Sequence, residues 1–174
     1  MATPSPIRRI VTAHNDAGLA VVQRDEQLET QPMAAFPGAK GRRIWVSDGF
    51  PAKDNNHDTD GATRLVTGPL GVGNPGATTF GITELAPGAM AAWHRTPTLD
   101  HNILISGKLI LMMEDGTEYL LENPGDVVIQ KGTLHAWRNP GPEVARWAAV
   151  IVDAEPAVVN GQPMLASTEK PPAL

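Results

Sequence analysis

The chain has 174 residues, a length that suits one domain with a full hydrophobic core. Its net charge is −5, and its lysines and arginines form no cluster beyond the pairs Arg8-Arg9 and Arg42-Arg43, which argues against nucleic-acid or anionic-membrane partners. The absence of cysteine excludes disulfides and thiolate chemistry.

The glycine and proline content favours a chain with many turns. The 17 glycines and 16 prolines make up about a fifth of the residues, against a usual combined share of roughly 12%. They separate short apolar runs without a repeat period, which is typical of all-β proteins. No apolar run is long enough to span a membrane. The twin arginine near the N-terminus is not followed by a signal-peptide core, so a cytoplasmic location is expected.

The first half of the chain predicts three strands and two loops. Residues 7–14 and 19–25 read as strands around the turn NDAG, and residues 42–48 read as a third strand. The polar residues 51–62 lack EF-hand spacing and predict a surface loop. GVGNPG at 71–76 matches a dinucleotide-binding pattern, but Pro75 and the strand-like residues after it indicate a glycine-rich loop instead.

The second half predicts eight short strands separated by turn signals, among them Asp115-Gly116. This spacing suits a closed or double-sheet β-barrel. The strands are expected at residues 78–85, 89–96, 101–106, 108–114, 117–122, 126–130, 135–139 and 145–153.

Two of these strands are apolar on both faces, at residues 101–106 and 108–113. They need cover on the outside of the barrel as well as on the inside. The N-terminal strands could supply that cover, or a second copy of the chain could, and a homodimer is expected.

Polar side chains gather near the ends of three predicted strands. Side chains two positions apart on a strand point to the same side of the sheet. His94 therefore shares a face with Thr96, and His135 shares a face with Trp137. Asp100 begins the strand that follows the turn at Pro97, so we expect it to converge with the two histidines inside the barrel. The residues expected to line the pocket beside them are Met90, Thr96, His101, Gln130 and Trp137.

The spacing of these residues resembles the two motifs of the cupin superfamily over residues 78–153. The first motif is G-x5-H-x-H-x3,4-E-x6-G, and Gly88, His94, Thr96, Asp100 and Gly107 fit each spacing. The second is G-x5-P-x-G-x2-H-x3-N, which Gly125, Gly132, His135 and Asn139 follow with one residue fewer before the second glycine.

This resemblance implies a jelly-roll barrel at 78–153, with N-terminal strands and a glycine-rich loop wrapping it at 1–77 and a tail at 154–174. The chain is also similar to a group of small single-domain cupins, some of which are encoded beside polyketide-type pathways.

The resemblance further implies a metal site formed by His94, Asp100 and His135, with Fe, Mn, Ni or Zn as the ion. Thr96 stands where the family has a second histidine, and Asp100 stands where it has glutamate. Two imidazoles and a carboxylate suffice for a facial site with open positions. His101 could supply a further ligand only through a bulge, because alternation points it to the other face.

The expected function is a metal-dependent oxidoreductase or lyase that acts on an organic acid or polyketide-like small molecule. A metal-free lyase or isomerase is the alternative: His94, oriented by Asp100, would remove a proton, and His135 would stabilise the oxyanion. A non-catalytic barrel that binds a small molecule is a third possibility. The residues assigned to catalysis are His94 and Asp100.

Overall fold

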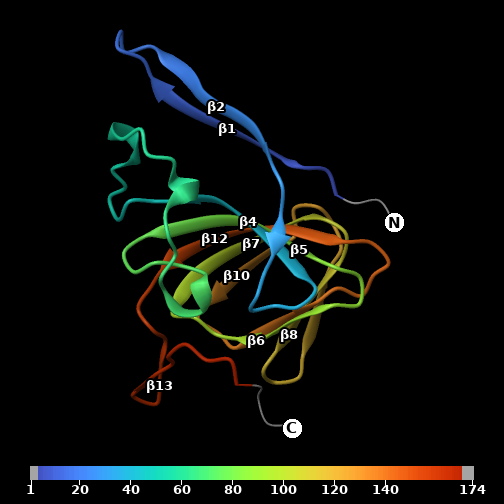
Figure 1. Ribbon diagram of the computed structural model, residues 1–174. Coiled ribbons are helices and arrows are strands. Elements are labelled where there is room, and N and C mark those ends of the chain that lie inside the picture. Colours follow the sequence, from blue (N-terminus) through green and yellow to red (C-terminus); the bar gives the residue numbers. More distant parts are fainter. Residues whose placement is uncertain (1–3, 170–174) are drawn as a thin grey trace.

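Two antiparallel sheets pack face to face in the computed structural model, which describes residues 4–169 (Figure 1). The large sheet has the strand order β10-β7-β12-β5-β4-β3, and the small sheet has the order β6-β11-β8-β9. The bounds are β3 Gln31–Pro32, β4 Ala39–Val46, β5 Thr78–Leu85, β6 Met90–His94, β7 Thr98–Ser106, β8 Leu109–Met113, β9 Glu118–Leu121, β10 Val127–Lys131, β11 His135–Arg138 and β12 Ala145–Asp153.

All eight strands predicted between residues 78 and 153 are present, as β5 to β12. The prediction of an all-β double-sheet barrel is confirmed. The described residues contain three short 3-10 helices, η1 Asp54–Asn56, η2 Gly61–Thr63 and η3 Pro69–Gly71, and no α-helix. Consequently none of their helices has the length and apolar character needed to cross a membrane. The glycine-rich loop leads directly into β5, as predicted.

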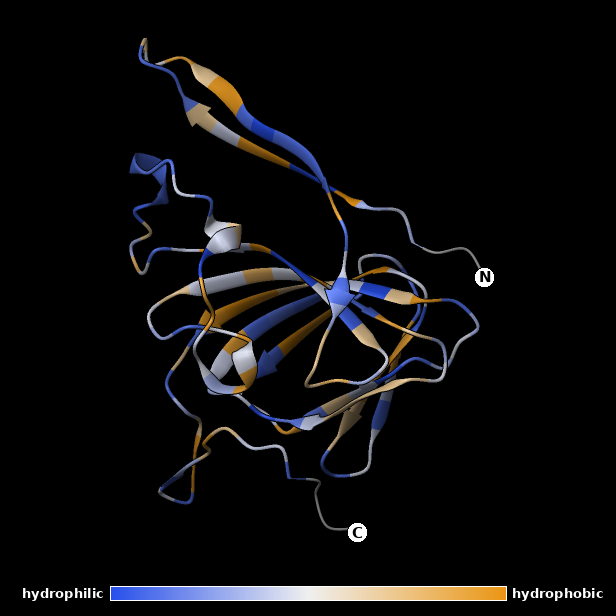
Figure 2. Cartoon of the chain, viewed as in Figure 1, coloured by the Kyte–Doolittle hydropathy of each residue, from blue (hydrophilic) through white to orange (hydrophobic). Residues whose placement is uncertain are grey.

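The main core lies between the two sheets and is built by alternation along their strands. One face of most strands contributes buried apolar side chains, and the orange bands in Figure 2 follow these strands across the barrel. The core residues are Phe36, Ala39, Leu85, Ala91, Leu104, Leu109, Leu111, Leu121, Trp137, Ala145 and Trp147.

Asn139 fixes the end of β11 beneath this core. Its side chain is fully buried, donates to the carbonyls of Leu85 and Glu143 at 2.8 and 2.7 Å, and accepts from the amide of Gly141 at 2.7 Å. The amide therefore satisfies three backbone groups that would otherwise be buried without partners.

The N-terminal segment divides between the large sheet and a separate hairpin. β4 pairs with β5 along its length and extends the large sheet. β1 Ile7–His14 and β2 Ala20–Leu28 form a two-stranded sheet of their own that projects beyond the barrel (Figure 1). Only the base of this hairpin packs on the barrel, where Ile7 and Leu28 join the outer face of the large sheet. The division of the chain at residues 77 and 153 stays a prediction.

The C-terminal segment runs across one end of the barrel. It contains the short hairpin of β13 Val158–Val159 and β14 Gln162–Pro163. Arg95 then exchanges backbone hydrogen bonds with Ser167 at 2.8 and 3.0 Å, and its Nε donates to the carbonyl of Leu165 at 2.8 Å. This tie holds the C-terminal segment next to the strand that carries His94.

Candidate functional site

A cavity of about 70 Å³ lies between the two sheets, with polar side chains on both sides of it. The large sheet contributes Asp100 and Asn102 from β7, and the small sheet contributes His94 from β6 and His135 from β11. This volume holds a few water molecules or one end of a ligand. The remaining lining comes from Met33, Phe36, Ala39, Val72, Thr83, Ala91, Thr96, Trp137, Trp147, Ala149 and Ile151.

The two histidines are held side by side by strand register. His135 is the paired residue of His94 between β11 and β6, and the centres of their rings are 4.3 Å apart. His94 Nδ1 lies 2.8 Å from the carbonyl of Ala92, and His135 Nδ1 lies 2.9 Å from the carbonyl of Thr133. A carbonyl oxygen only accepts, so each Nδ1 carries the proton and each Nε2 keeps its lone pair.

Burial keeps both rings neutral. Desolvation lowers the pKa of His94, and desolvation, with the neighbouring His94, lowers the pKa of His135 to about 3. At neutral pH the site therefore presents two uncharged hydrogen-bond acceptors. A ring in this state has no Nε2 proton to donate, so His135 does not fit the predicted role of oxyanion donor.

Asp100 carries the carboxyl group of the cavity. Burial raises its pKa to about 6, although a hydrogen bond from Thr98 and the charge of the neighbouring His101 oppose the shift. Its Oδ1 is buried without a hydrogen-bond partner among the described residues. Because such an atom is costly to leave unpaired, it marks a place where a ligand can bind.

The predicted hydrogen-bonded pair of His94 and Asp100 does not form in this structure. His94 Nδ1 is engaged by the carbonyl of Ala92, and Asp100 Oδ1 has no hydrogen-bond partner among the described residues. The two residues belong to opposite sheets and face the same cavity. They can therefore act on one ligand without acting on each other.

Five of the predicted residues do line one cavity: His94, Thr96, Asp100, His135 and Trp137. Met90, His101 and Gln130 are not among the lining residues. Met90 is 38% exposed, and Gln130 is buried beside Asp100 in the β10–β7 register, donating to the Thr133 hydroxyl at 2.9 Å. His101 follows Asp100 directly in β7, where no bulge reverses the alternation, so it belongs to the outer face.

Asn102 is a polar lining residue that the sequence reasoning missed. It is 6% exposed, and it lines the cavity on the same strand face as Asp100. The signal was present in HNILIS, since a polar residue two positions after Asp100 shares its face. Phe36 was also missed, because its ring reaches His94 (5.0 Å between ring centres) from a distant loop.

The histidine pair fits two positions of a divalent metal site. The tautomer with Nδ1–H on a carbonyl and Nε2 free is the one that metal-bound histidines adopt. The structure does not bring Asp100 to this pair as a third ligand: in the part of the chain that is described, no three His, Cys, Asp or Glu side chains gather as a metal-binding group.

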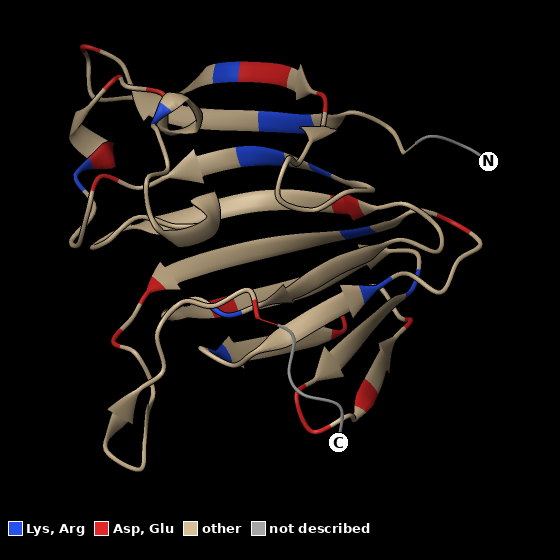
Figure 3. Ribbon diagram, turned by 60° about the horizontal axis from the view of Figure 1, so that its bottom comes forward, with Lys and Arg blue, Asp and Glu red and all other residues tan. Residues whose placement is uncertain are grey.

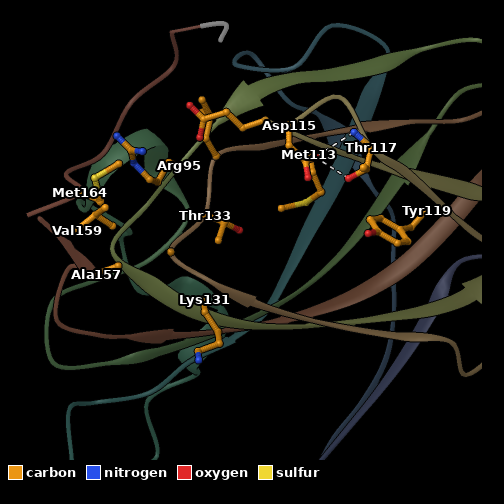
Figure 4. Close-up of a pocket in the computed structure, with 13 residues that line it drawn as sticks. Arg95, Met113, Asp115, Thr117, Tyr119, Lys131, Thr133, Ala157, Val159 and Met164 are labelled. Carbon is orange, nitrogen blue, oxygen red and sulfur yellow. Dashed lines mark hydrogen bonds between the residues drawn. The ribbon is translucent and has the colours of Figure 1, made fainter. Parts of the chain in front are cut away.

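A second and larger pocket of about 470 Å³ is lined in part by sequence neighbours of the two histidines (Figure 4). Arg95, next to His94, and Thr133 and Leu134, next to His135, form part of its wall. Its apolar surface comes from Met113, Tyr119, Val159 and Met164, and its other lining residues are Glu114, Asp115, Thr117, Lys131, Gly132 and Ala157. Asp100 lines the smaller cavity instead.

Comparisons with known proteins agree with this architecture. The cupin-domain family profile matches residues 81–152. The chain is 41% identical to oryzines biosynthesis cluster protein J of Aspergillus oryzae, over 90% of this chain and 88% of that protein. It is 27% identical to the cupin-domain-containing oxidoreductase fogC of Aspergillus ruber, over 92% of this chain and 79% of that protein.

Two solved structures share the fold at 12% sequence identity. The Schizosaccharomyces pombe Cnp3 cupin domain has a TM-score of 0.52 and aligns over 84% of this chain and 87% of its own. The polyketide cyclase RemF of Streptomyces resistomycificus has a TM-score of 0.51 and aligns over 82% and 83%.

Proposed function

The chain belongs to the cupin family, and from this we propose that it is an enzyme that transfers a proton within a small organic molecule bound in the barrel. One observation carries the proposal. A buried carboxyl with a pKa raised to about 6, Asp100, shares a cavity with the carboxamide of Asn102 and two neutral imidazoles. General acid–base catalysis is most effective when the pKa lies near the working pH.

Each polar group has a role that its protonation state allows. Asp100, as a carboxylate, removes a proton from carbon next to a substrate carbonyl, and Asn102 donates a hydrogen bond to the oxygen that gains the charge. His94 and His135 accept hydrogen bonds from substrate hydroxyl groups through Nε2. Return of the proton to another atom completes an isomerisation, and departure of a leaving group from the adjacent carbon completes a lyase reaction.

The proposed substrates are organic acids or polyketide-like compounds. Two relatives at 26% identity are named phomopsin biosynthesis cluster proteins, and the 41% identical relative is named for oryzine biosynthesis. The aromatic walls formed by Phe36, Trp137 and Trp147 favour flat, unsaturated groups. Such compounds carry acidic C–H bonds beside carbonyls, which match the proposed chemistry.

A second candidate is a metal-dependent oxidoreductase. The tautomers of His94 and His135 favour it, as do relatives named cupin-domain-containing oxidoreductases. In this case the two histidines would hold a Fe, Mn, Ni or Zn ion, which supplies Lewis-acid polarisation of a substrate oxygen. Asp100 would still be the group that moves a proton.

Solvent-deuterium exchange into a panel of β-keto and β-hydroxy acids, followed by NMR, tests the proposal. We expect exchange by the wild type at a rate that rises with pH through about 6. Asp100→Asn should slow it by roughly 10²–10⁴-fold, and Met90→Ala, outside the cavity, should leave it unchanged. Unaltered exchange by Asp100→Asn would contradict the proposal.

Elemental analysis and chelation separate the two candidates. The proton-transfer proposal predicts exchange that survives strong chelators. A stoichiometric transition metal in the wild type, lost in a His94→Ala/His135→Ala variant together with activity, would favour the metal-dependent candidate instead.

A further inference from the structure

The larger cavity of about 470 Å³, here called the outer pocket, takes no part in the proposed reaction (Figure 4). Its volume lies within the range of roughly 300–1,000 Å³ that is usual for small-molecule sites. The inner cavity beside Asp100 has about 70 Å³. Of these two cavities, the outer pocket is therefore the one with room for a whole organic molecule.

Three segments far apart in the sequence build the outer pocket: the turn between β8 and β9, the turn between β10 and β11, and the C-terminal hairpin of β13 and β14. The amide of Met164 donates to the carbonyl of Ala157 at 2.7 Å, which closes the hairpin. The paired backbones of Arg95 and Ser167 attach the segment that follows it to the barrel. The C-terminal wall of the pocket is thus part of the folded structure.

Arg95 places an oriented guanidinium in the wall of the outer pocket. The side chain is half-buried, and its Nε donates to the carbonyl of Leu165 at 2.8 Å, which fixes the plane of the group. A guanidinium has five N–H donors in a rigid fork, and this hydrogen bond uses one of them. Such a fork binds a carboxylate through two parallel hydrogen bonds.

The two basic residues of the outer pocket, Arg95 and Lys131, have no ion-pair partner among residues 4–169. Arg138, on β11 nearby, is paired with Glu118 at 2.7 Å. Side chains of both signs lie on the strands and turns of this part of the barrel (Figure 3). The two unpaired cations of the pocket can therefore bind an anionic ligand.

The acidic residues of the lining do not cancel this preference. Glu114 and Asp115 are exposed, so solvent screens their charges more than that of the half-buried Arg95. Oδ1 of Asp115 also accepts from the amide and the hydroxyl of Thr117, at 3.0 and 2.6 Å. The least solvated charge in the pocket is the guanidinium, so the pocket favours an anion.

Apolar side chains form much of the remaining lining, with Met113, Tyr119, Val159 and Met164 among them. Tyr119 and Val159 are 57% and 51% exposed, so a ligand in the pocket would cover apolar surface that now faces water. Methionine side chains adapt to the shape of what they contact, and the tyrosine ring offers an aromatic face. The ligand that fits this lining carries an apolar body beside its anionic group.

We propose that the outer pocket is a second binding site, for a carboxylate with an aromatic or aliphatic body. The carboxylate binds the guanidinium of Arg95, Lys131 adds a second positive charge, and the body packs between Tyr119 and the C-terminal hairpin. This site does not depend on the proposed proton transfer, because Asp100 lines the inner cavity and not the outer pocket.

Isothermal titration calorimetry of the full chain with phenylbutyrate and with octanoate tests the proposal. We expect saturable binding with a dissociation constant below about 1 mM, which is reasonable for ligands of this size. Neutral phenylbutanamide should bind at least about tenfold more weakly, because it lacks the charge that Arg95 recognises. Arg95→Gln should weaken carboxylate binding by a similar factor. Arg138→Gln, which removes the same charge outside the pocket, should leave it unchanged.

Val158 and Val159 provide a matched pair that leaves Arg95 in place. Val159 lines the pocket and Val158 does not, and both are largely exposed, so each position tolerates a charge. In the view of Figure 4, Val159 lies on the same side of the pocket as Arg95. Val159→Asp should weaken phenylbutyrate binding and Val159→Lys should strengthen it, each by at least about threefold. Val158→Asp should have no effect.

Three results would overturn the proposal: no saturable binding of either carboxylate, equal binding of phenylbutyrate and phenylbutanamide, or equal effects of Val158→Asp and Val159→Asp. Binding that is lost in Asp100→Asn but kept in Arg95→Gln would also overturn it, since the carboxylate would then occupy the inner cavity. Circular dichroism confirms that each variant is folded. The Val159 variants decide the matter should Arg95→Gln release the C-terminal segment.

Discussion

Three consecutive residues of β7 decide the chemistry of the cavity. Asp100 and Asn102 face inward and His101 faces outward, because β7 keeps regular alternation at this point. The inward pair lines the same cavity as His94 and His135 from the opposite sheet. A shift of one residue would turn His101 inward and take the carboxyl of Asp100 and the carboxamide of Asn102 out of the cavity.

The raised pKa of Asp100 predicts a pH-dependent cost to stability. Its pKa is about 6 in the folded chain, against 3.8 for an aspartate in water, so the native state holds its proton more tightly between these values. Stability relative to Asp100→Asn should therefore fall as the pH rises from about 4 to about 6, by up to roughly 3 kcal/mol. Urea unfolding of both proteins across this pH range measures the difference.

Asp115→Asn is the control for the sign of this effect. The hydroxyl and amide of Thr117 lower the pKa of Asp115, so the wild type should gain stability relative to this variant as the pH rises. Parallel stability curves for the wild type and Asp100→Asn would show that burial does not raise the pKa of Asp100.

At the level of elements, residues that favour turns separate the strands, and one buried arginine orients the N-terminal hairpin of β1 and β2. Asp115-Gly116 and the other turn signals separate strands that form within a few residues of their predicted bounds. The sequence did not predict how the N-terminal hairpin sits, because its orientation depends on Arg9, which looks like an ordinary surface arginine in IRRIVTAH. Its partner Asp60 lies 51 residues away, in a loop expected to be solvated.

Arg9→Met should destabilise the chain by roughly 2–4 kcal/mol. Removing the guanidinium leaves Asp60, whose side chain is 12% exposed, and the carbonyl of Ile44 without their partner. The exposed carboxylate of Glu26 should contribute less to this cost. Chemical denaturation monitored by tryptophan fluorescence gives the value.

Arg8→Met provides the matched comparison one residue away. Arg8 pairs with Asp25 between the same two strands, but both side chains are largely exposed. Its loss should have little effect on stability, because exposed ion pairs are screened by solvent. Equal losses of unfolding free energy for the two variants would mean that the burial of Arg9 does not anchor the N-terminal hairpin.

For the whole molecule, the spacing of the motif residues predicted the barrel because the motif glycines stand at turns that need a positive φ. Gly88, Gly107, Gly125 and Gly132 all have positive φ, from 61° to 97°, at turns that the fold repeats. Spacing alone does not identify the groups that bind each histidine Nδ1 or the loop that carries Phe36 to the cavity. Both features depend on side-chain packing between segments far apart in the sequence. The same packing decides that, among the described residues, Asp100 does not form a three-residue metal-binding group with the two histidines.

Gly107 joins the two sheets, and Gly107→Ala should damage the molecule more than the same change at Gly125. Both residues have positive φ, at 75° and 97°, so each substitution introduces the left-handed strain of roughly 1–2 kcal/mol. A Cβ at Gly107 would also lie 2.5 Å from the carbonyl oxygen of Val144 and 2.8 Å from Ala145 Cα, whereas one at Gly125 would meet nothing within 4 Å. Because Ala145 begins β12, the neighbour of β7 in the large sheet, relief of this contact must shift the turn between β7 and β8 against the start of β12. We expect the extra loss for Gly107→Ala to be about 1–3 kcal/mol, the usual range for overpacking. Thermal unfolding of the two variants measures it, and similar midpoints would show that the turn between β7 and β8 can shift away from Val144 and Ala145 at little cost.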